Sequence, residues 1–347
     1  MSTSGVDRYS RIFSTPEVDI ELPPMKVVVA GGSGFLGSAL TTALTSRGHE
    51  TVILSRHPPA PSSGSRHGVR HVAWRPDSGV DQATSDWSRE IDGADAVVNL
   101  AGASLADDRW TAARKTVLRD SRINSTRQLV GAVRTAARAP TVFLQGSAVG
   151  YYGTSFDQTF DESSRPGSDF LATLCVDWER EGQAAAASGC RVVTLRTAVA
   201  LAREGGALKK MLLPFQLGVG GPIASGRQWF PWIHRDDWVA MVVWSLETPA
   251  VTGPVNVAAP SPVTNAEFTR AFGTALHRPA FIPMPGFALR LLFGELADAG
   301  LINGQRVMPK RATDLGFRFK YAEIAPALKA AVTKAKHGDH GGRAPSS

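Results

Sequence analysis

The chain has 347 residues, of which 43% are hydrophobic and 20% charged, and its formal net charge is +7. These values are typical of a globular protein with a large core, organised as one large domain or two unequal ones. The basic residues are scattered among apolar positions and form no continuous stripe with aromatics, so the charge does not indicate nucleic-acid binding. No apolar run reaches the roughly 18 residues that a membrane-spanning helix needs, so we expect no membrane association.

The two ends of the chain differ in composition from its body. Residues 1–24 are polar, end in two prolines and lack the apolar core of a signal peptide, so we expect a flexible extension. Residues 336–347 are expected to form a disordered tail. Cys175 and Cys190 match neither a disulfide framework nor a zinc motif. We therefore expect buried thiols, no metal site and a cytoplasmic protein.

Short apolar segments alternate with helical ones between Lys26 and Leu201. Strand-like runs occupy 26–30, 51–56, 69–74, 94–102, 141–148 and 190–201. Helical composition or spacing covers 35–45, 121–137 and 170–188. Strands that are apolar throughout belong to parallel sheets with helices on both faces. The pattern therefore predicts an α/β fold with a doubly wound parallel sheet of Rossmann type.

Three glycines separate the first strand from the first helix, with the spacing G-x-x-G-x-x-G. The first allows a tight turn, the second lets the backbone approach a pyrophosphate, and the third lets the helix pack closely on the strand. The N–H groups at the start of the helix then face the phosphates. In this strand–turn–helix context the pattern predicts a dinucleotide site made by Gly31, Ser33, Gly34, Phe35, Leu36 and Gly37.

The end of the second strand favours NADP over NAD. An NAD site usually places Asp or Glu about 20 residues after the glycines, where the carboxylate binds the ribose hydroxyls. No acidic residue occurs between Thr51 and Pro76, and Ser55 and Arg56 stand at the expected strand end. A guanidinium and a hydroxyl are suited to a 2′-phosphate. The alternative for Arg56 is an exposed arginine on a loop.

Several segments together resemble the extended and atypical short-chain dehydrogenase/reductase superfamily: GGSGFLGSAL at 31–40, ADAVVNLAG at 94–102, SRINSTRQLV at 121–130, GSAVGYYG at 146–153 and WIHRDD at 232–237. More narrowly, the chain resembles the nucleoside-diphosphate-sugar epimerase-like proteins, whose small C-terminal domain carries a motif close to GQRVMPKRATDLGFRF at 304–319. The resemblance runs from Met25 to about Val332. It implies an NADP-dependent oxidoreductase or epimerase acting on a small polar metabolite or sugar nucleotide. Homodimers are usual among such proteins, although no interface can be recognised in this sequence.

The resemblance also implies roles for individual residues. The segment Asn99, Leu100, Ala101 and Gly102 matches one that lies against the adenosine and ribose of the cofactor. Arg196 and Thr197 match a strand end near the nicotinamide, and Asn124 matches an asparagine of the central helix. Ser147 matches a hydroxyl that hydrogen-bonds substrate, and Tyr152 matches the tyrosine of a Tyr-Gly turn.

Beyond Ala200 the alternation loosens into a stretch rich in Gly, Pro and aromatic residues, which suits a pocket wall. We expect an NADP-binding domain over 25–250, with part of the substrate pocket from about 203–235, and a small C-terminal substrate lobe over 251–335. The motif at 304–319 is expected to form one helix that packs on the cofactor domain and carries Arg306, Lys310 and Arg311. Three further cations are candidates either for binding an anionic substrate or for simple exposure to solvent: Lys209, Lys210 and Arg227.

The chain lacks the Tyr-x-x-x-Lys pair of active short-chain dehydrogenases, in which the lysine lowers the tyrosine pKa for proton transfer. None of its four tyrosines has a lysine four residues later. By spacing from Glu179, the pair would fall on Leu171 and Cys175, which cannot repeat this chemistry.

Three explanations remain open. Another group replaces the tyrosine, or the proton arrives through water, or the protein binds NADP as a regulator without turnover. Ser147, Tyr151 and Tyr152 are the catalytic candidates, with aromatic packing as the alternative for the tyrosines. Cys175 and His234 are weaker candidates, for which a packed thiol and a structural His–Asp pair are the simpler interpretations.

Overall fold

The computed structural model describes residues 23–59, 68–76 and 85–333. The predicted tail at 336–347, and all but the last two residues of the predicted extension at 1–24, lie outside this part. Within the described part, no helix is both long and apolar enough to cross a bilayer.

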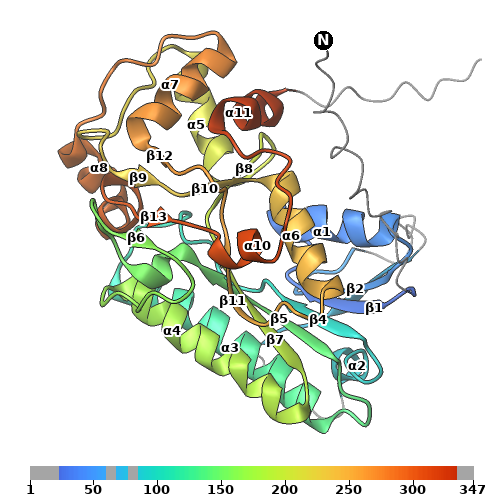
Figure 1. Ribbon diagram of the computed structural model, residues 1–347. Coiled ribbons are helices and arrows are strands. Elements are labelled where there is room, and N and C mark those ends of the chain that lie inside the picture. Colours follow the sequence, from blue (N-terminus) through green and yellow to red (C-terminus); the bar gives the residue numbers. More distant parts are fainter. Residues whose placement is uncertain (1–22, 60–67, 77–84, 334–347) are drawn as a thin grey trace, which may run out of the picture.

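Seven parallel strands form one large sheet in the order β11-β7-β5-β4-β1-β2-β3 (Figure 1). The strands are β1 (Lys26–Ala30), β2 (Glu50–Ser55), β3 (Val69–Ala73), β4 (Ala96–Asn99), β5 (Val142–Ala148), β7 (Arg191–Thr197) and β11 (Gly253–Val257). Hydrophobic side chains fill the central strands because both faces of the sheet are covered.

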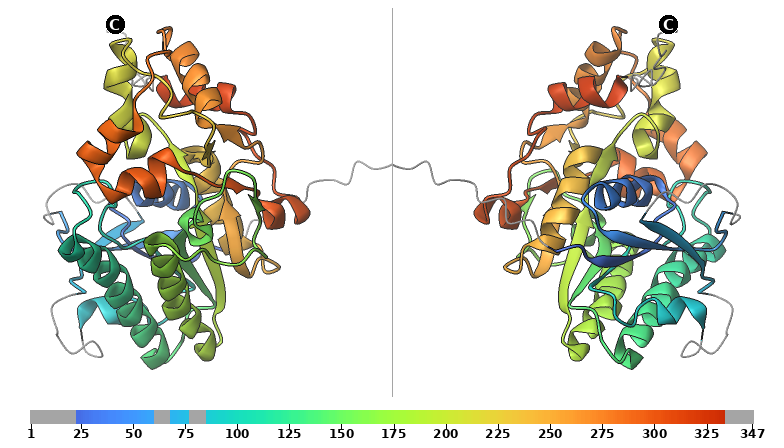
Figure 2. Two further views of the ribbon diagram at one scale, coloured as in Figure 1. Left: turned by 90° about the vertical axis from the view of Figure 1, so that its left-hand side faces the viewer. Right: turned by 90° about the vertical axis from the view of Figure 1, so that its right-hand side faces the viewer.

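Helices cover the two faces of the sheet (Figure 2). On one face, Val27 and Val29 pack with residues of α1 (Phe35–Ser46) and α6 (Arg235–Glu247). On the other, Val28 and Ala30 pack with residues of α2 (Asp86–Arg89) and α3 (Ala112–Thr135), and α4 (Phe170–Gln183) lies beside α3. Successive side chains of a strand point to opposite faces, so the apolar run of β1 serves both layers. The predicted doubly wound fold is confirmed.

The strand order reverses at β1, which has β2 on one side and β4 on the other. Ala30, the last residue of β1, pairs with Leu54 of β2 and with Asn99 of β4. In an open parallel sheet, ligands bind outside the carboxyl ends of the strands at such a reversal. The predicted glycine turn, Ser55 and Asn99 therefore meet at one edge.

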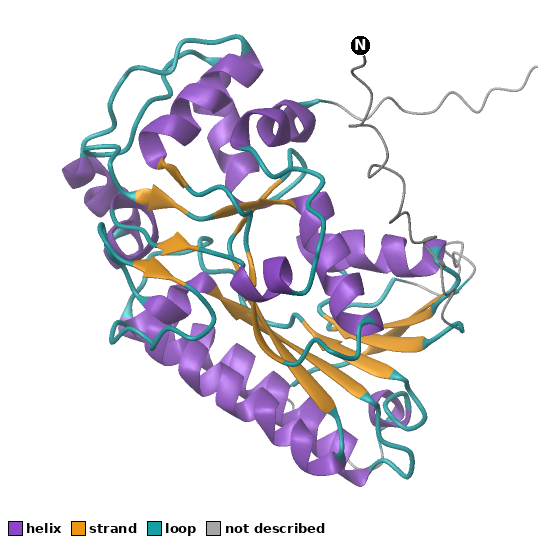
Figure 3. Ribbon diagram, in the orientation of Figure 1, coloured by secondary structure: helices purple, strands orange, loops and turns teal. Residues whose placement is uncertain are grey.

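A smaller, mainly helical lobe packs beside this sheet (Figure 3). It contains α5 (Gly206–Gln216), α7 (Asn265–Leu276), α8 (Gly286–Phe293) and α11 (Ile324–Val332), with the strand pairs β8 (Val199–Leu201) and β10 (Trp232–His234), and β9 (Trp229–Phe230) and β12 (Val263–Thr264). Its core includes Phe215 and Phe272, whose ring centroids are 4.5 Å apart. The remaining elements are η2 (Val149–Tyr152), β6 (Thr159–Phe160), η3 (Ala184–Ser188), α9 (Glu295–Ala297), η4 (Asp298–Ile302), β13 (Arg306–Val307) and α10 (Lys310–Asp314).

Two predicted boundaries differ from the structure where the chain passes between the large sheet and the lobe. The strand predicted at 190–201 breaks at Ala198, whose N–H donates to Val257 O (3.0 Å), so β7 stays in the large sheet and β8 pairs with β10 in the lobe. In addition, β11 pairs with β7, although it follows residue 250, where the larger domain was expected to end. The large sheet thus extends past that boundary.

Three predicted helices also differ in extent. The helix predicted at 121–137 is α3, which begins earlier because the Thr111 hydroxyl caps it by accepting from the Arg114 N–H (3.1 Å). The helix predicted at 170–188 ends at residue 183 and tightens into η3 before Gly189, which has φ +83°. The single helix predicted for the 304–319 motif is wrong: Arg306 lies in β13, and only Lys310 and Arg311 lie in α10.

Candidate functional site

The turn between β1 and α1 depends on close backbone packing. Gly31 has φ +81°, and a Cβ there would lie 2.9 Å from the carbonyl carbon of Leu100. A Cβ on Gly37 would overlap the carbonyl oxygen of Gly31, which instead accepts a hydrogen bond from the Gly34 N–H (3.0 Å). Glycine at these positions therefore brings the helix, the turn and the loop after β4 into direct contact.

The first turn of α1 has the features that are typical of anion-binding helix N-termini. Gly34 is the N-cap residue, no side chain caps the helix, and its first turn carries no acidic side chain. The first N–H groups of a helix have no intrahelical acceptor, so those of Phe35, Leu36 and Gly37 are available to a phosphate. Ser33 and Gly34 are exposed beside them. The six residues predicted to make the dinucleotide site thus form one continuous turn.

The end of β2 lies next to this turn. The Gly31 N–H donates to Leu54 O (3.3 Å), so the two residues that follow Leu54 are adjacent to the glycines. Ser55 is buried, and its Oγ accepts from the His57 N–H (3.3 Å), whereas Arg56 is exposed. The predicted pair Ser55 and Arg56 therefore stands where the adenosine ribose of a dinucleotide lies in doubly wound folds.

The loop after β4 is held from inside by Asn99. Its amide donates to Thr126 Oγ1 (2.9 Å) and Gln145 Oε1 (3.1 Å), and its Oδ1 accepts from the Ala101 N–H (3.2 Å). The Leu100 N–H donates to Ala30 O (2.9 Å), which anchors the loop to β1. Asn99 is fully buried, so it positions the loop of Leu100, Ala101 and Gly102, whose backbone borders the glycine turn.

Arg196 belongs to an internal network. Its guanidinium forms two hydrogen bonds with the Glu179 carboxylate, both of 2.9 Å, and donates through Nη1 to the Tyr152 hydroxyl (3.0 Å). Ser147 Oγ donates to the same carboxylate (2.6 Å), and the Tyr152 hydroxyl donates to Asn256 Oδ1 (2.6 Å). The structure thus brings Ser147, Tyr152 and Arg196 together at the ends of β5 and β7.

Sequence reasoning missed two members of this network, Glu179 and Asn256. In the sequence, Glu179 only located the positions of the superfamily's tyrosine and lysine, and no role was predicted for its own carboxylate. Its position four residues after Cys175 puts it on the face of α4 that contains that buried thiol, and this spacing was an available signal. Asn256 lies in β11, and nothing local indicates that it meets Tyr152, which is 104 residues away in sequence.

The two adjacent tyrosines have different surroundings. Tyr152 is buried, and burial raises its pKa to about 12 against the opposing effect of Arg196, so its hydroxyl keeps its proton at neutral pH. Tyr151 is half-buried, and its ring centroid lies 3.4 Å from the guanidinium carbon of Arg196. Among the described residues, none forms a hydrogen bond with the Tyr151 hydroxyl. Of the two, Tyr151 has the hydroxyl that is free to meet a ligand.

The weaker candidates are enclosed by their own chain. Burial raises the pKa of the Cys175 thiol to about 11, and Sγ lies 3.7 Å from Ala148 O. Burial lowers the pKa of His234 to about 4, and its Nδ1 accepts from the Asp236 N–H (3.1 Å) at the N-terminus of α6. The neutral imidazole therefore caps a helix. Leu171 packs against Gly150, where a Cβ would be 3.2 Å from the Leu171 Cβ.

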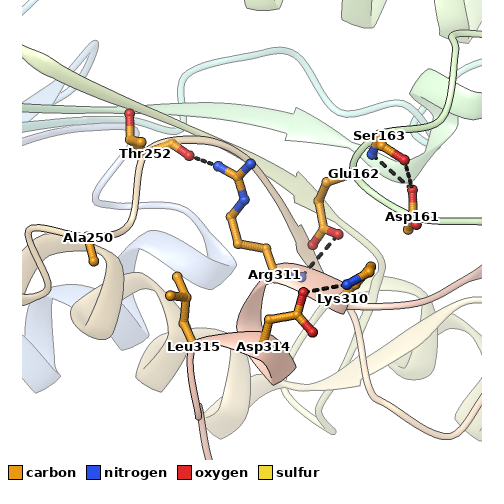
Figure 4. A pocket seen from close by; sticks show the side chains of 9 residues that line it. All are labelled: Asp161, Glu162, Ser163, Ala250, Thr252, Lys310, Arg311, Asp314 and Leu315. Carbon is orange, nitrogen blue, oxygen red and sulfur yellow. Dashed lines mark hydrogen bonds and ion pairs between the residues drawn. The ribbon is translucent and has the colours of Figure 1, made fainter.

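Two cations of the C-terminal motif, Lys310 and Arg311, line a charged hollow of about 440 Å³ beside α10 (Figure 4). Arg311 donates its N–H to Glu162 Oε2 (3.2 Å) and its Nη1 to Thr252 O, and Lys310 pairs with Asp314. The two bonds of Arg311 fasten the motif to the residue before β11 and to the segment after β6. The hollow is thus held together by charges that already have partners.

The other predicted positions lie on the surface or inside the fold. Lys209, Lys210 and Arg227 are exposed, and Lys210 Nζ donates to Ala106 O (2.7 Å). Thr197 Oγ1 accepts from Trp238 Nε1 (3.2 Å), and Asn124 is half-buried on α3. Within the described residues, no group of three or more His, Cys, Asp or Glu side chains is placed to hold a metal ion.

A parallel sheet that reverses at β1, with a three-glycine turn at that point, defines a dinucleotide-binding fold. The chain belongs to the NAD dependent epimerase/dehydratase family, whose model matches residues 27–258. A second model, a domain of unknown function (DUF1731), matches residues 284–331, which include α8 and α11 of the smaller lobe. The predicted resemblance to the epimerase-like short-chain dehydrogenases is confirmed.

Similar proteins cover nearly the whole described chain. The epimerase family protein Mb2239 of Mycobacterium bovis is 43% identical over 310 residues, which are 89% of this chain and 98% of that protein. The crystal structure of human epimerase family protein SDR39U1 with NADPH is 37% identical, covers 88% of this chain and 99% of its own, and has a TM-score of 0.77. The nucleoside-diphosphate sugar epimerase from Corynebacterium glutamicum is 32% identical, with a TM-score of 0.71, and covers 89% of this chain and 58% of its own.

Proposed function

We propose that the chain binds NADPH and acts as an atypical epimerase-family oxidoreductase on a small polar metabolite or a sugar nucleotide. One observation carries the cofactor assignment: Ser55 and Arg56 directly adjoin the Gly31 turn, and no acidic residue follows β2 before Pro76. The human relative with NADPH and the nucleoside-diphosphate sugar epimerase from Corynebacterium support this proposal.

The residues present fit the cofactor part by part. The N–H groups of residues 35–37 would hold the pyrophosphate, and Arg56 with Ser55 would hold the 2′-phosphate. The backbone of the loop from Leu100 to Gly102 would border the adenosine and ribose side. When bound, the nicotinamide supplies or accepts hydride.

The chain's own groups at the ends of β5 and β7 would orient the substrate and handle the proton. Ser147 and Tyr152 hold the Glu179–Arg196 pair, so we assign them positioning roles. Tyr151 is the candidate for proton transfer because its hydroxyl is uncommitted among the described side chains. Tyr151→Phe should lower turnover while NADPH affinity stays constant, and an unchanged rate would remove Tyr151 from the chemistry.

The cofactor preference is tested by substituting Arg56 with glutamate. Arg56→Glu should weaken NADPH binding by at least about tenfold, with little change for NADH, because a carboxylate repels the 2′-phosphate and a charged hydrogen bond is lost. Arg47→Glu is the matched control, since it makes the same charge change at the other end of α1, where Arg47 is exposed. If NADPH and NADH binding weaken equally in Arg56→Glu, the phosphate assignment is wrong.

A second candidate is a regulator that binds NADPH without turnover. The observation that favours it is the pair Leu171 and Cys175, packed and unable to exchange protons at neutral pH, where the superfamily has tyrosine and lysine. Nicotinamide fluorescence tests for net reduction when a cofactor-depleted metabolite extract is added to the protein–NADPH complex. Protein-dependent decay of the emission supports a reductase. Stable emission supports either a regulator or an epimerase that returns its hydride.

A further inference from the structure

Two arginines in the described part of the chain are buried, Arg122 and Arg196. Arg196 has the Glu179 carboxylate as its partner. Arg122, on α3, is 9% exposed, and no carboxylate among the described residues pairs with it. Its Nη1 donates to Leu118 O (2.9 Å) within its own helix, which leaves its other donors without a protein acceptor in the described part. Buried charges are normally paired, so Arg122 is an exception that needs a reason.

The described residues around Arg122 supply no negative charge. Its guanidinium carbon lies 5.1 Å from the ring centroid of Trp178 on α4. Burial is the main influence on its pKa, which falls to about 10, and the field of a second cation, Arg114, acts in the same direction. The Cys175 thiol, which also acts on it, has a pKa of about 11 and is neutral at pH 7. Arg122 is therefore charged at neutral pH and lacks a counter-charge from the described residues.

Arg122 lies at the edge of the sheet where a ligand is expected. A Cβ on Gly102 would be 3.1 Å from the Arg122 guanidinium carbon, so this side chain lies against the loop after β4. The same loop contains Leu100, which packs on Gly31. The guanidinium also lies near Trp178 on α4. Cys175 on the same helix reaches the end of β5, because its Sγ lies near Ala148 O. The guanidinium thus stands at the carboxyl ends of β4 and β5, beside the strand reversal.

We propose that Arg122 binds an anionic group of the substrate, a carboxylate or a phosphate. This rests on the proposed function, because it places the substrate at the same edge as NADPH. A guanidinium presents a planar fork of donors that matches both anions, and such hydrogen bonds are stronger away from water. The two phosphate-bearing parts of the cofactor already have the start of α1 and Arg56. Neither part of the cofactor therefore needs Arg122, and its guanidinium is available to the substrate.

The test uses inorganic phosphate and malonate as probes of the two anion chemistries, with and without NADPH. Dissociation constants come from calorimetry, and melting temperatures are compared with chloride at equal ionic strength. The variants are Arg122→Met, which keeps an unbranched apolar stem without the charge, and Arg122→Lys, which keeps the charge without the fork. Arg127→Met is the matched control, because Arg127 is on the same helix but exposed and paired with Glu181.

Wild type should bind at least one probe and melt at a higher temperature in its presence. Arg122→Met should weaken that binding by at least about tenfold, while Arg127→Met leaves it unchanged. Without a probe, Arg122→Met should melt no lower than wild type, since it removes an unpaired buried charge. Should Arg122→Met not fold, Arg122→Lys carries the test, with weaker probe binding expected.

Three results would overturn the proposal. In the first, wild type binds neither probe. In the second, the Arg122 variants bind the probes as wild type does. In the third, NADPH binding falls by about tenfold in Arg122→Met while probe binding persists, which would assign Arg122 to a cofactor phosphate. Failure of wild type to bind NADPH would instead refute the proposed function, and the probe measurements on cofactor-free protein would still decide the role of Arg122.

Discussion

Arg196 and Glu179 form a bidentate ion pair between β7 and α4, with both N···O distances at 2.9 Å. The pair is almost fully enclosed, and it fixes the Ser147 and Tyr152 hydroxyls around it. The hydroxyls that the sequence proposes for catalysis are therefore oriented by a charge pair inside the fold. Their positions depend on that pair remaining intact.

Glu179→Ala is expected to lower the free energy of unfolding by about 3 kcal/mol, because it leaves the Arg196 guanidinium buried and unpaired. Glu181→Ala breaks the exposed pair with Arg127 on the same helix and should lower it by less than about 1 kcal/mol. Urea unfolding measures both. Equal losses in the two variants would show that the buried pair contributes no more to the free energy of unfolding than the exposed pair.

Gly37→Ala is expected to weaken NADPH binding by at least about tenfold, because the new Cβ overlaps the Gly31 carbonyl oxygen and forces the turn to shift. Gly131→Ala is the control, since a Cβ at this position on α3 meets nothing within 4 Å. It should leave NADPH binding unchanged and stabilise the fold by about 0.5–1 kcal/mol. Unchanged NADPH affinity in Gly37→Ala would refute the assignment of the turn.

His234 should make stability depend on pH in the mildly acidic range. Its pKa in the folded protein is about 4, below the ordinary value of 6.5. Its contribution is therefore fully present above pH 6.5 and is lost as the pH falls through 4, when the unfolded chain takes up the proton first. The loss should be on the order of 2–3 kcal/mol, because the folded and unfolded pKa values are about 4 and 6.5 and each pH unit between them is worth about 1.4 kcal/mol.

The reference for this measurement is His234→Asn, because asparagine also caps helices and does not titrate. Unfolding free energies of the two proteins, measured by urea between pH 7 and pH 4, are subtracted at each pH. The difference removes contributions that do not come from His234, including those of the charges that act on it, such as Asp236 and Glu204. A difference that does not vary with pH would contradict the buried, neutral imidazole.

Asp237→Ala is expected to loosen the C-terminal segment. The Asp237 carboxylate is buried and accepts from the N–H groups of Lys320 and Tyr321, both at 2.8 Å. Leaving those two donors unsatisfied should lower the free energy of unfolding by about 3 kcal/mol and speed tryptic cleavage at Lys320. Asp236→Ala is the control: Asp236 is half-buried, and its carboxylate lies 3.9 Å from Lys320 Nζ, a weak surface pair whose loss should change the cleavage rate much less.

The sequence by itself determined the features that depend on local geometry. A three-glycine turn between a strand and a helix permits few conformations, so Gly31, Gly34 and Gly37 could be assigned before the fold was known. Strands that are apolar throughout require cover on both faces, so the doubly wound sheet followed as well. The absence of an acidic residue between β2 and Pro76 was also visible in the sequence.

Only the tertiary structure decided which polar side chains have partners. Glu179, Arg196 and Asn256 come from three distant elements, and no local pattern shows that Ser147 and Tyr152 hydrogen-bond within their network. Conversely, Arg122 lies in an ordinary-looking helix segment, and its missing counter-charge becomes evident only when α3, α4 and the loop after β4 enclose it. Burial and pairing arise from contacts between distant segments, and those contacts set the charge state and the availability of each group.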